Sequence, residues 1–328
     1  MVKQILPLLM LLSLPALAAK PLLTVYTYDS FSAEWGPGPA VKKAFEAQCG
    51  CELRYVALED GVSLLNRVRM EGKNSKADVV LGLDNNLLQA AQQTGLFAKS
   101  GVDTRTLALP GGWQDQTFVP FDYGYFAFVY DKKRLKNPPT SLKELVESPE
   151  KWRVIYEDPR TSTPGLGLLL WMQKVYGDNA PEAWQKLARK TVTVTKGWSE
   201  AYGLFLKGEG DLVLSYTTSP AYHLIEEKKE NYAAAPFTEG HYLQVEVAAQ
   251  LASSKQPKLA QQFMQFMLTP AFQNAIPTGN WMYPVIKSDL PAGFQTLSVP
   301  QTALQYSPQE VAQQRANWIS AWQRAVSR

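Results

Sequence analysis

Two short segments of the chain combine hydroxyl side chains with a proline, a combination typical of the start of a helix. They are Ser162-Thr163-Pro164-Gly165 and Thr217-Thr218-Ser219-Pro220. Hydroxyl groups and unpaired backbone N–H groups at a helix N-terminus suit a phosphate or another anion. Ordinary helix capping explains either segment alone, whereas two such segments in one half of the chain give an anion site equal weight. Neither segment has the Gly-x-x-x-x-Gly-Lys pattern, so nucleotide hydrolysis is not indicated.

Aromatic residues in turns form a second group that could bind a ligand. Trp198 and Trp281 both lie in Gly-containing turns, where a large ring has little core to fill. The other aromatic candidates are Tyr26, Tyr28, Trp35, Tyr216, Tyr222 and Tyr283. Aromatic faces attract flat or cationic ligands, at roughly 0.5–2 kcal/mol for each cation contact. Asp60 could add a carboxylate, whereas Asp84 is expected to cap a helix. The two groups together describe a ligand with a flat cationic part and an anionic tail.

Composition and charge exclude several classes of protein. Of 328 residues, 45% are hydrophobic and 19% are charged, which is typical of a folded chain and not of a disordered or fibrous one. The length allows two domains with a cleft between them. The formal charge of +3 is spread along the chain, so no nucleic acid partner is expected.

The N-terminus has the order of a secretory signal peptide. Lys3 precedes an apolar run over residues 5–14, and Ala16-Leu17-Ala18 follows as a small-x-small cleavage site. The run is shorter than the roughly 20 residues that span a bilayer, and no later segment is apolar enough to do so. We therefore predict a signal peptide over residues 1–18 and an exported mature chain.

The two cysteines, Cys49 and Cys51, are separated by one glycine in a chain that is expected to meet an oxidising compartment. They could form a redox or metal-binding pair, or else a local disulfide or two idle thiols. Together with the two histidines, His223 and His241, they cannot assemble a zinc site without carboxylate ligands from elsewhere. We favour the structural interpretation and predict no metal site.

Strand and helix patterns alternate along the chain, which predicts an α/β fold with mainly parallel sheets flanked by helices. The strands are expected over residues 22–26, 53–57, 77–83, 153–156, 192–195, 212–216 and 243–248. The helices are expected over residues 39–47, 62–70, 86–94, 164–176, 181–188, 199–207, 220–228, 257–268, 270–275 and 308–326. The aromatic run over residues 117–130 is too long and too punctuated for one ordinary strand, and we interpret it as a crossing between two lobes.

In such sheets, ligands bind beyond the carboxyl ends of the strands. This rule selects four loops, at residues 59–61, 161–165, 197–199 and 215–220. All four face one cleft if the two lobes present their carboxyl edges to each other.

Five segments of the chain resemble the thiamine-binding family of type II periplasmic binding proteins in Gram-negative bacteria. They lie at residues 22–30, 58–62, 77–86, 158–165 and 278–284, and the resemblance extends over essentially the whole mature chain. It implies two lobes, over residues 19–121 plus 274–328 and over residues 122–273, with the ligand cleft between them. It also implies a function, which is to capture thiamine, thiamine monophosphate and thiamine diphosphate in the periplasm and deliver them to an inner-membrane ABC permease.

The same resemblance implies which residues bind the ligand. They are Tyr28, Asp60, Gly61, Ser162, Thr163, Trp198, Tyr216, Thr217, Thr218, Ser219, Tyr222 and Trp281. Asp60 and Gly61 would contact the ligand from the first lobe, and the two hydroxyl-rich segments would lie at its phosphate end. Tyr222 and Trp281 would enclose the pyrimidine. The chain is expected to act as a monomer and to need no cofactor, because thiamine and its phosphates are transported ligands.

Two other functions remain open. A thiaminase-like enzyme would use a cysteine nucleophile, but Cys49 and Cys51 precede a strand and so are expected at the end of the sheet away from the cleft. A polyamine or ferric-ion carrier could use a tyrosine-rich cleft, although tryptophans cannot ligate a metal and few paired carboxylates are predicted there. We therefore expect a binding protein without enzymatic activity.

Overall fold

The computed structural model describes residues 18–328. The predicted signal peptide lies outside the described residues, apart from Ala18. The strands are β1 (Leu22–Tyr28), β2 (Glu52–Leu58), β3 (Val79–Asp84), β4 (Phe97–Ala98), β5 (Val119–Asp131), β6 (Val154–Glu157), β7 (Thr191–Thr195), β8 (Leu212–Tyr216), β9 (Tyr232–Ala234), β10 (His241–Leu251), β11 (Tyr283–Pro284) and β12 (Ala303–Leu304).

Helices cover the faces of the strands. They are α1 (Asp29–Ser32), α2 (Gly38–Cys49), α3 (Gly61–Glu71), α4 (Leu88–Gln93), α5 (Leu142–Glu147), α6 (Thr163–Tyr176), α7 (Ala180–Ala188), α8 (Trp198–Leu206), α9 (Ser219–Glu226), α10 (Pro257–Phe266), α11 (Pro270–Gln273), α12 (Ile276–Gly279) and α13 (Pro308–Val326). Each strand and helix predicted from the sequence overlaps one of these elements, with ends displaced by a few residues.

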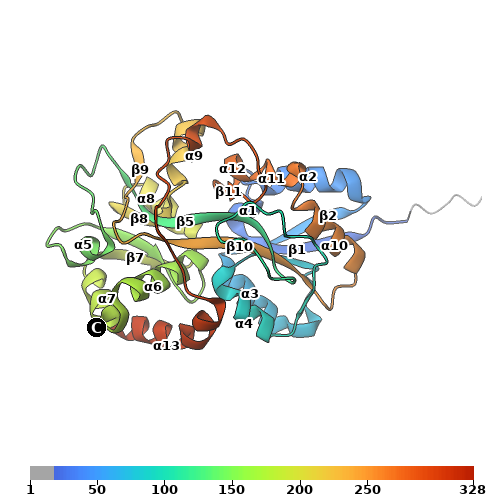
Figure 1. Ribbon diagram of the computed structural model, residues 1–328, viewed down its shortest axis with the longest axis horizontal. Helices are drawn as coiled ribbons and strands as arrows, with labels where there is room; N and C mark the ends of the chain where they lie inside the picture. The colour runs from blue at the N-terminus through green and yellow to red at the C-terminus, as the bar shows by residue number, and fades with distance from the viewer. Residues whose placement is uncertain (1–17) are drawn as a thin grey trace, which may run out of the picture.

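The strands form two parallel sets that are joined by antiparallel strands. In what we call the first lobe, β1 pairs in parallel with β2 and β3. In the second lobe, β6 pairs in parallel with β7 and β8. Between them lie β10 and β5, so that the continuous order is β2-β1-β3-β10-β5-β8-β6-β7. Figure 1 shows the first lobe, blue and cyan, beside the second lobe, largely green and yellow. The predicted two-lobed α/β fold is confirmed.

The strand β5 passes from one lobe to the other. Its first half pairs with β10, for example Tyr123 with Val245, and its second half pairs with β8, for example Phe128 with Leu214. The predicted crossing at residues 117–130 is therefore confirmed. The run forms a single strand of 13 residues, longer than an ordinary strand because it serves two sheets in succession.

The cysteines form a disulfide, Cys49–Cys51, between the end of α2 and the start of β2. The intervening Gly50 has a left-handed backbone (φ 60°), which glycine adopts at little cost. This pairing confirms a local disulfide and excludes two free thiols. As predicted, both cysteines lie before β2, at the opposite end of that strand from its carboxyl edge.

The C-terminal helix α13 packs against α4 of the first lobe and against α7 of the second lobe. At its end, the indole Nε1 of Trp322 donates a 3.0 Å hydrogen bond to the hydroxyl of Tyr156 at β6. The helix α10, which falls within the predicted second lobe, packs against α2 and β10. The precise lobe boundaries therefore stay a prediction.

Candidate functional site

The main cavity among the described residues has a volume of about 360 Å³ and lies between the lobes. Ligand pockets in proteins are typically of this size or larger. It opens at the carboxyl ends of β1, β2 and β8 and at the N-termini of α6 and α8. Its lining residues are Tyr28, Asp29, Ser30, Trp35, Glu59, Asp60, Thr163, Pro164, Trp198, Ser199, Tyr202, Gly203, Leu206, Tyr216, Ser219, Tyr222, Glu246, Gly279, Asn280, Trp281 and Met282.

Eight of the twelve predicted ligand residues line this cavity. They are Tyr28, Asp60, Thr163, Trp198, Tyr216, Ser219, Tyr222 and Trp281. The four loops selected from the sequence each contribute at least one of them, so the expected convergence of strand ends occurs. Direct contact of these residues with a ligand stays a prediction.

The other four predicted residues lie behind the cavity wall. Ser162 is buried and caps α6, where its hydroxyl accepts a 3.1 Å hydrogen bond from the Gly165 N–H. The Thr218 hydroxyl donates to the carbonyl oxygen of Trp281 at 2.5 Å, and the buried Thr217 hydroxyl has no partner among the described residues. Gly61 packs directly against the side chain of Thr163. These contacts hold the lining residues of the cavity in position.

Asp60 connects the two lobes. It caps α3 by accepting a 2.7 Å hydrogen bond from the Gly61 N–H. From the second lobe, the Thr163 hydroxyl and the Trp198 N–H each donate to its carboxylate at 3.1 Å. The carboxylate thus lies at the N-termini of three helices, α3, α6 and α8, where backbone dipoles favour a negative charge. Burial nevertheless raises the pKa of Asp60 to about 6, although the hydrogen bonds act to lower it.

The close approach of the lobes at Asp60 depends on a glycine. A Cβ atom on Gly197, the N-cap of α8, would stand 2.5 Å from the carbonyl oxygen of Glu59. Only glycine therefore lets the two backbones approach this closely. Nearby, the Ser63 N–H donates to the carbonyl oxygen of Thr161 at 2.9 Å, again across the lobes.

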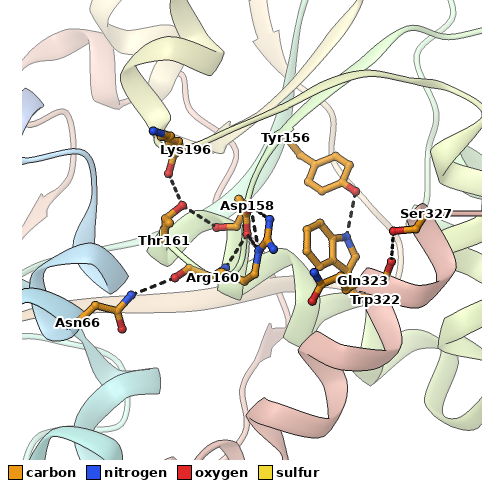
Figure 2. Close-up of polar contacts among 9 residues, drawn as sticks. All are labelled: Asn66, Tyr156, Asp158, Arg160, Thr161, Lys196, Trp322, Gln323 and Ser327. Carbon is orange, nitrogen blue, oxygen red and sulfur yellow. Dashed lines mark hydrogen bonds and ion pairs between the residues drawn. The ribbon is translucent and has the colours of Figure 1, made fainter. Parts of the chain in front are cut away.

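The turn at residues 158–161 extends this contact toward the C-terminus. Figure 2 shows Asn66 of α3 reaching the carbonyl oxygen of Arg160 at 3.2 Å. The Arg160 guanidinium pairs with Asp158 at 2.7 Å and lies 5.6 Å from the ring of Trp322 in α13. The turn therefore touches the first lobe on one side and the C-terminal helix on the other.

Aromatic rings form the walls of the cavity. Trp198 stacks on Tyr202 with ring centroids 5.0 Å apart, and its indole N–H donates to the hydroxyl of Ser215 at 2.9 Å. Tyr222 and Trp281 meet edge to face at 5.3 Å. Trp281 has a left-handed backbone (φ 56°), a conformation that is rare for a bulky residue and is usually maintained for a local purpose.

The floor of the cavity is formed by the buried carboxylate of Glu246, with Asp122 behind it, and sequence analysis selected neither residue. Glu246 lies in β10 directly opposite Asp122 in β5. The Tyr28 hydroxyl donates to Glu246, and the side-chain amide of Asn280 donates to the Tyr28 hydroxyl at 2.9 Å and to Asp122 at 2.6 Å. A signal was present, because Glu246 interrupts an otherwise largely apolar strand. Asp84, predicted as a cap, accepts a 2.9 Å hydrogen bond from the Asn86 N–H and is not a lining residue.

The charges of the lining residues are all of one sign. Asp29, Glu59, Asp60 and Glu246 are acidic, and none of the lining residues is a lysine, arginine or histidine. An aromatic cavity with this charge favours a flat cationic ligand. The residues that the structure describes include no group of three or more histidine, cysteine, aspartate or glutamate side chains arranged to hold a metal ion. No helix within residues 18–328 is both long and apolar enough to cross a membrane.

Two lobes joined by crossing strands, with a cavity at their facing edges, define a protein that binds a small molecule between its lobes. The family of bacterial extracellular solute-binding proteins matches this chain over residues 36–274. The chain is 78% identical to the thiamine-binding periplasmic protein of Salmonella typhimurium strain LT2 and 77% identical to that of Escherichia coli strain K12, in both cases over all 328 residues and the full length of the relative. A solved structure titled periplasmic thiamin binding protein is 79% identical, superposes with a TM-score of 0.93, and is matched over 94% of this chain and 97% of that chain.

The chain therefore belongs to the bacterial extracellular solute-binding proteins. The resemblance to their thiamine-binding periplasmic members is confirmed.

Proposed function

We propose that this chain captures thiamine, thiamine monophosphate and thiamine diphosphate in the periplasm and delivers them to an inner-membrane ABC permease. The observation that carries the proposal is the aromatic cavity, whose charged lining residues are all acidic. Thiamine joins a permanently cationic thiazolium to a flat aminopyrimidine, so it matches both features. The full-length relatives, which are named thiamine-binding periplasmic proteins, support the same ligand and the same compartment.

The phosphate tail of the two phosphorylated forms would lie at the N-termini of α6 and α9. Thr163 and Ser219 begin these helices and line the cavity. With no basic lining residue to neutralise a phosphate, binding would rely on hydroxyl and backbone N–H donors. Ser162 would act through the position of α6, because it caps that helix from behind the wall.

Delivery to a permease would depend on closure of the lobes around the ligand. The hydrogen bonds from Thr163 and Trp198 to Asp60 exist only when the lobes are together. A ligand that contacts both lobes favours the closed form by the difference in its affinity for the two forms. The permease would then recognise the closed surface of a monomer.

Calorimetry tests the ligand. The mature chain is denatured to remove any ligand carried through purification, refolded, and titrated with thiamine and thiamine diphosphate. Ferric ion and spermidine are titrated in parallel as probes of the two carrier alternatives. We expect one thiamine to bind tightly for each chain, while a folded protein that binds ferric ion or spermidine in its place would refute the proposal.

We also infer that binding occurs without turnover. Cys49 and Cys51 are joined in a disulfide and neither lines the cavity, which argues against a cysteine nucleophile there. Thiamine incubated with the protein and recovered by chromatography should be intact. Cleavage that is lost in Cys49→Ser or Cys51→Ser would instead support a thiaminase-like enzyme.

A further inference from the structure

Glu246 and Asp122 are a directly paired, buried couple of acidic residues, which disfavours a charge on both in an empty cavity. They are paired in register on the adjacent antiparallel strands β10 and β5, so their side chains leave the same face of the sheet. Like charges that face each other in this way are destabilising. A shift in the strand register immediately follows this pair, and such bulges re-aim side chains near binding sites.

The partners of the pair donate too few hydrogen bonds to hold two negative charges. Tyr28 donates to one oxygen of Glu246, and Asn280 donates to one oxygen of Asp122. The other oxygen of Asp122 is buried without a partner among the described residues. A buried carboxylate oxygen without a hydrogen bond strongly disfavours the ionised form.

Within residues 18–328, the titratable groups that act on the pair supply no positive charge. The acids that act on Glu246 are Asp122 of β5, Asp60 at the start of α3 and Asp84 of β3. The tyrosines that face the pair are Tyr28 of β1 and Tyr216 of β8. Burial raises the pKa of Glu246 well above its usual value and Asp122 raises it further, while burial also raises the pKa of Asp122.

The geometry points to an exchange of a proton for a ligand cation. We propose that Glu246 and Asp122 share one proton in the empty protein, and that capture of a cationic ligand in the cavity releases this proton to the solvent. Glu246 lines the cavity and Asp122 lies behind it, so the ligand cation would approach the pair through Glu246. In this exchange one O–H bond of the pair breaks and the proton passes to the buffer. The charge of the two carboxylates together then changes from −1 to −2.

This inference rests on the proposed function, because it requires a cationic ligand such as thiamine. It makes Glu246 and Asp122 responsible for selecting cationic over neutral ligands. A neutral molecule of the same shape could not compensate the negative charge of the second carboxylate and would leave the proton in place. It also predicts that affinity increases with pH. Protons compete with the cation, so the affinity for thiamine should increase by up to tenfold for each pH unit until the pair in the empty protein is ionised.

The experiment counts protons. Thiamine is titrated into the refolded mature protein at pH 7.5 in buffers that differ in ionisation enthalpy. The observed binding enthalpy is plotted against the ionisation enthalpy of the buffer, and the slope of this plot gives the number of protons released for each ligand bound. At this pH Asp60, whose pKa is about 6, is largely ionised and contributes little. We expect a release approaching one proton, and a dissociation constant that decreases between pH 6.5 and pH 8.5.

Variants locate the proton. Glu246→Gln should abolish the release and make a weakened affinity independent of pH. Asp122→Asn should reduce the release and move the pH profile of affinity to lower pH, because Glu246 then loses its charged neighbour. Glu182→Gln, at an exposed glutamate of α7 outside the cavity, is the matched control and should behave as the wild type.

The failures can be told apart. Normal thiamine binding by the wild type with no proton release overturns the shared proton and leaves the proposed function intact. A proton count that is unchanged in a folded Glu246→Gln protein assigns the proton to another group and also overturns the inference. A folded wild-type protein that binds no thiamine overturns the proposed function itself.

Discussion

Replacing Asp60 with asparagine tests whether this carboxylate couples ligand capture to closure. The two shorter of its hydrogen bonds from the second lobe come from the Thr163 hydroxyl and the Trp198 N–H, both at 3.1 Å. A hydrogen bond to a charged group contributes about 1.5–3 kcal/mol. Asparagine keeps one acceptor oxygen and directs an amide N–H toward a donor, so both bonds are weakened or lost. The closed form should lose about 3 kcal/mol.

A closed form that is less stable by about 3 kcal/mol lowers the affinity for thiamine roughly 100-fold. Calorimetry at pH 8 measures this loss with Asp60 fully ionised in the wild type, since its pKa is about 6. Small-angle scattering at saturating thiamine measures closure independently. We expect Asp60→Asn to reach the same compact form only at much higher thiamine concentrations.

The matched control is Asp115→Asn. Asp115 also accepts two backbone hydrogen bonds, from Thr117 at 2.8 Å and Phe118 at 2.7 Å, but it is not a lining residue of the cavity. This variant should lower thermal stability and leave the affinity for thiamine unchanged. If Asp60→Asn binds thiamine within threefold of the wild type, Asp60 does not couple closure to binding and the reasoning is wrong.

Four further predictions follow from other parts of the molecule. Trp281→Ala should weaken thiamine and both phosphates by a similar factor, roughly 2- to 30-fold for a lost cation contact, and calorimetry that finds one form spared would contradict this. Ser162→Ala should remove the cap of α6, lower stability by about 1 kcal/mol and weaken the phosphorylated forms most; equal losses for all forms would remove its phosphate role. Burial raises the pKa of Glu157 well above its usual value, so the folded protein holds the proton of this carboxyl more tightly than the unfolded chain does. The free energy of unfolding therefore falls as the pH rises toward the pKa of the folded protein. Glu157→Gln should flatten that fall, measured by urea unfolding between pH 6.5 and pH 8.5. Reduction of Cys49–Cys51 should leave thiamine affinity unchanged, because neither cysteine lines the cavity.

The sequence was sufficient to predict the elements and the loops that meet at the cavity. Asp60 and Trp198 were identified because each follows a strand and opens a helix, which is a local pattern. The rule that ligands bind beyond strand ends then brought these distant turns together. Trp281 was identified because a tryptophan in a glycine-containing turn has little core to fill.

The floor of the cavity could not be predicted in the same way. Whether Glu246 faces Asp122 depends on the register of β10 against β5, and a shift of one residue would turn the side chain to the other face. Asn280 gains its role only from the fold that brings it to Tyr28 and Asp122. The difference between Ser219, which lines the cavity, and Ser162, which lies behind it, likewise depends on packing and not on residue type.

The strand β5 has a consequence for how the molecule comes apart. Because it pairs with β10 on one side and continues into a pairing with β8, each lobe depends on the same thirteen residues for its sheet. Loss of either sheet would free one half of a strand whose other half belongs to the sheet of the other lobe. The two halves should therefore melt as one cooperative unit, in a single transition, even if closure around a ligand moves them as separate bodies. A ligand held at the cleft would raise the midpoint of that whole transition.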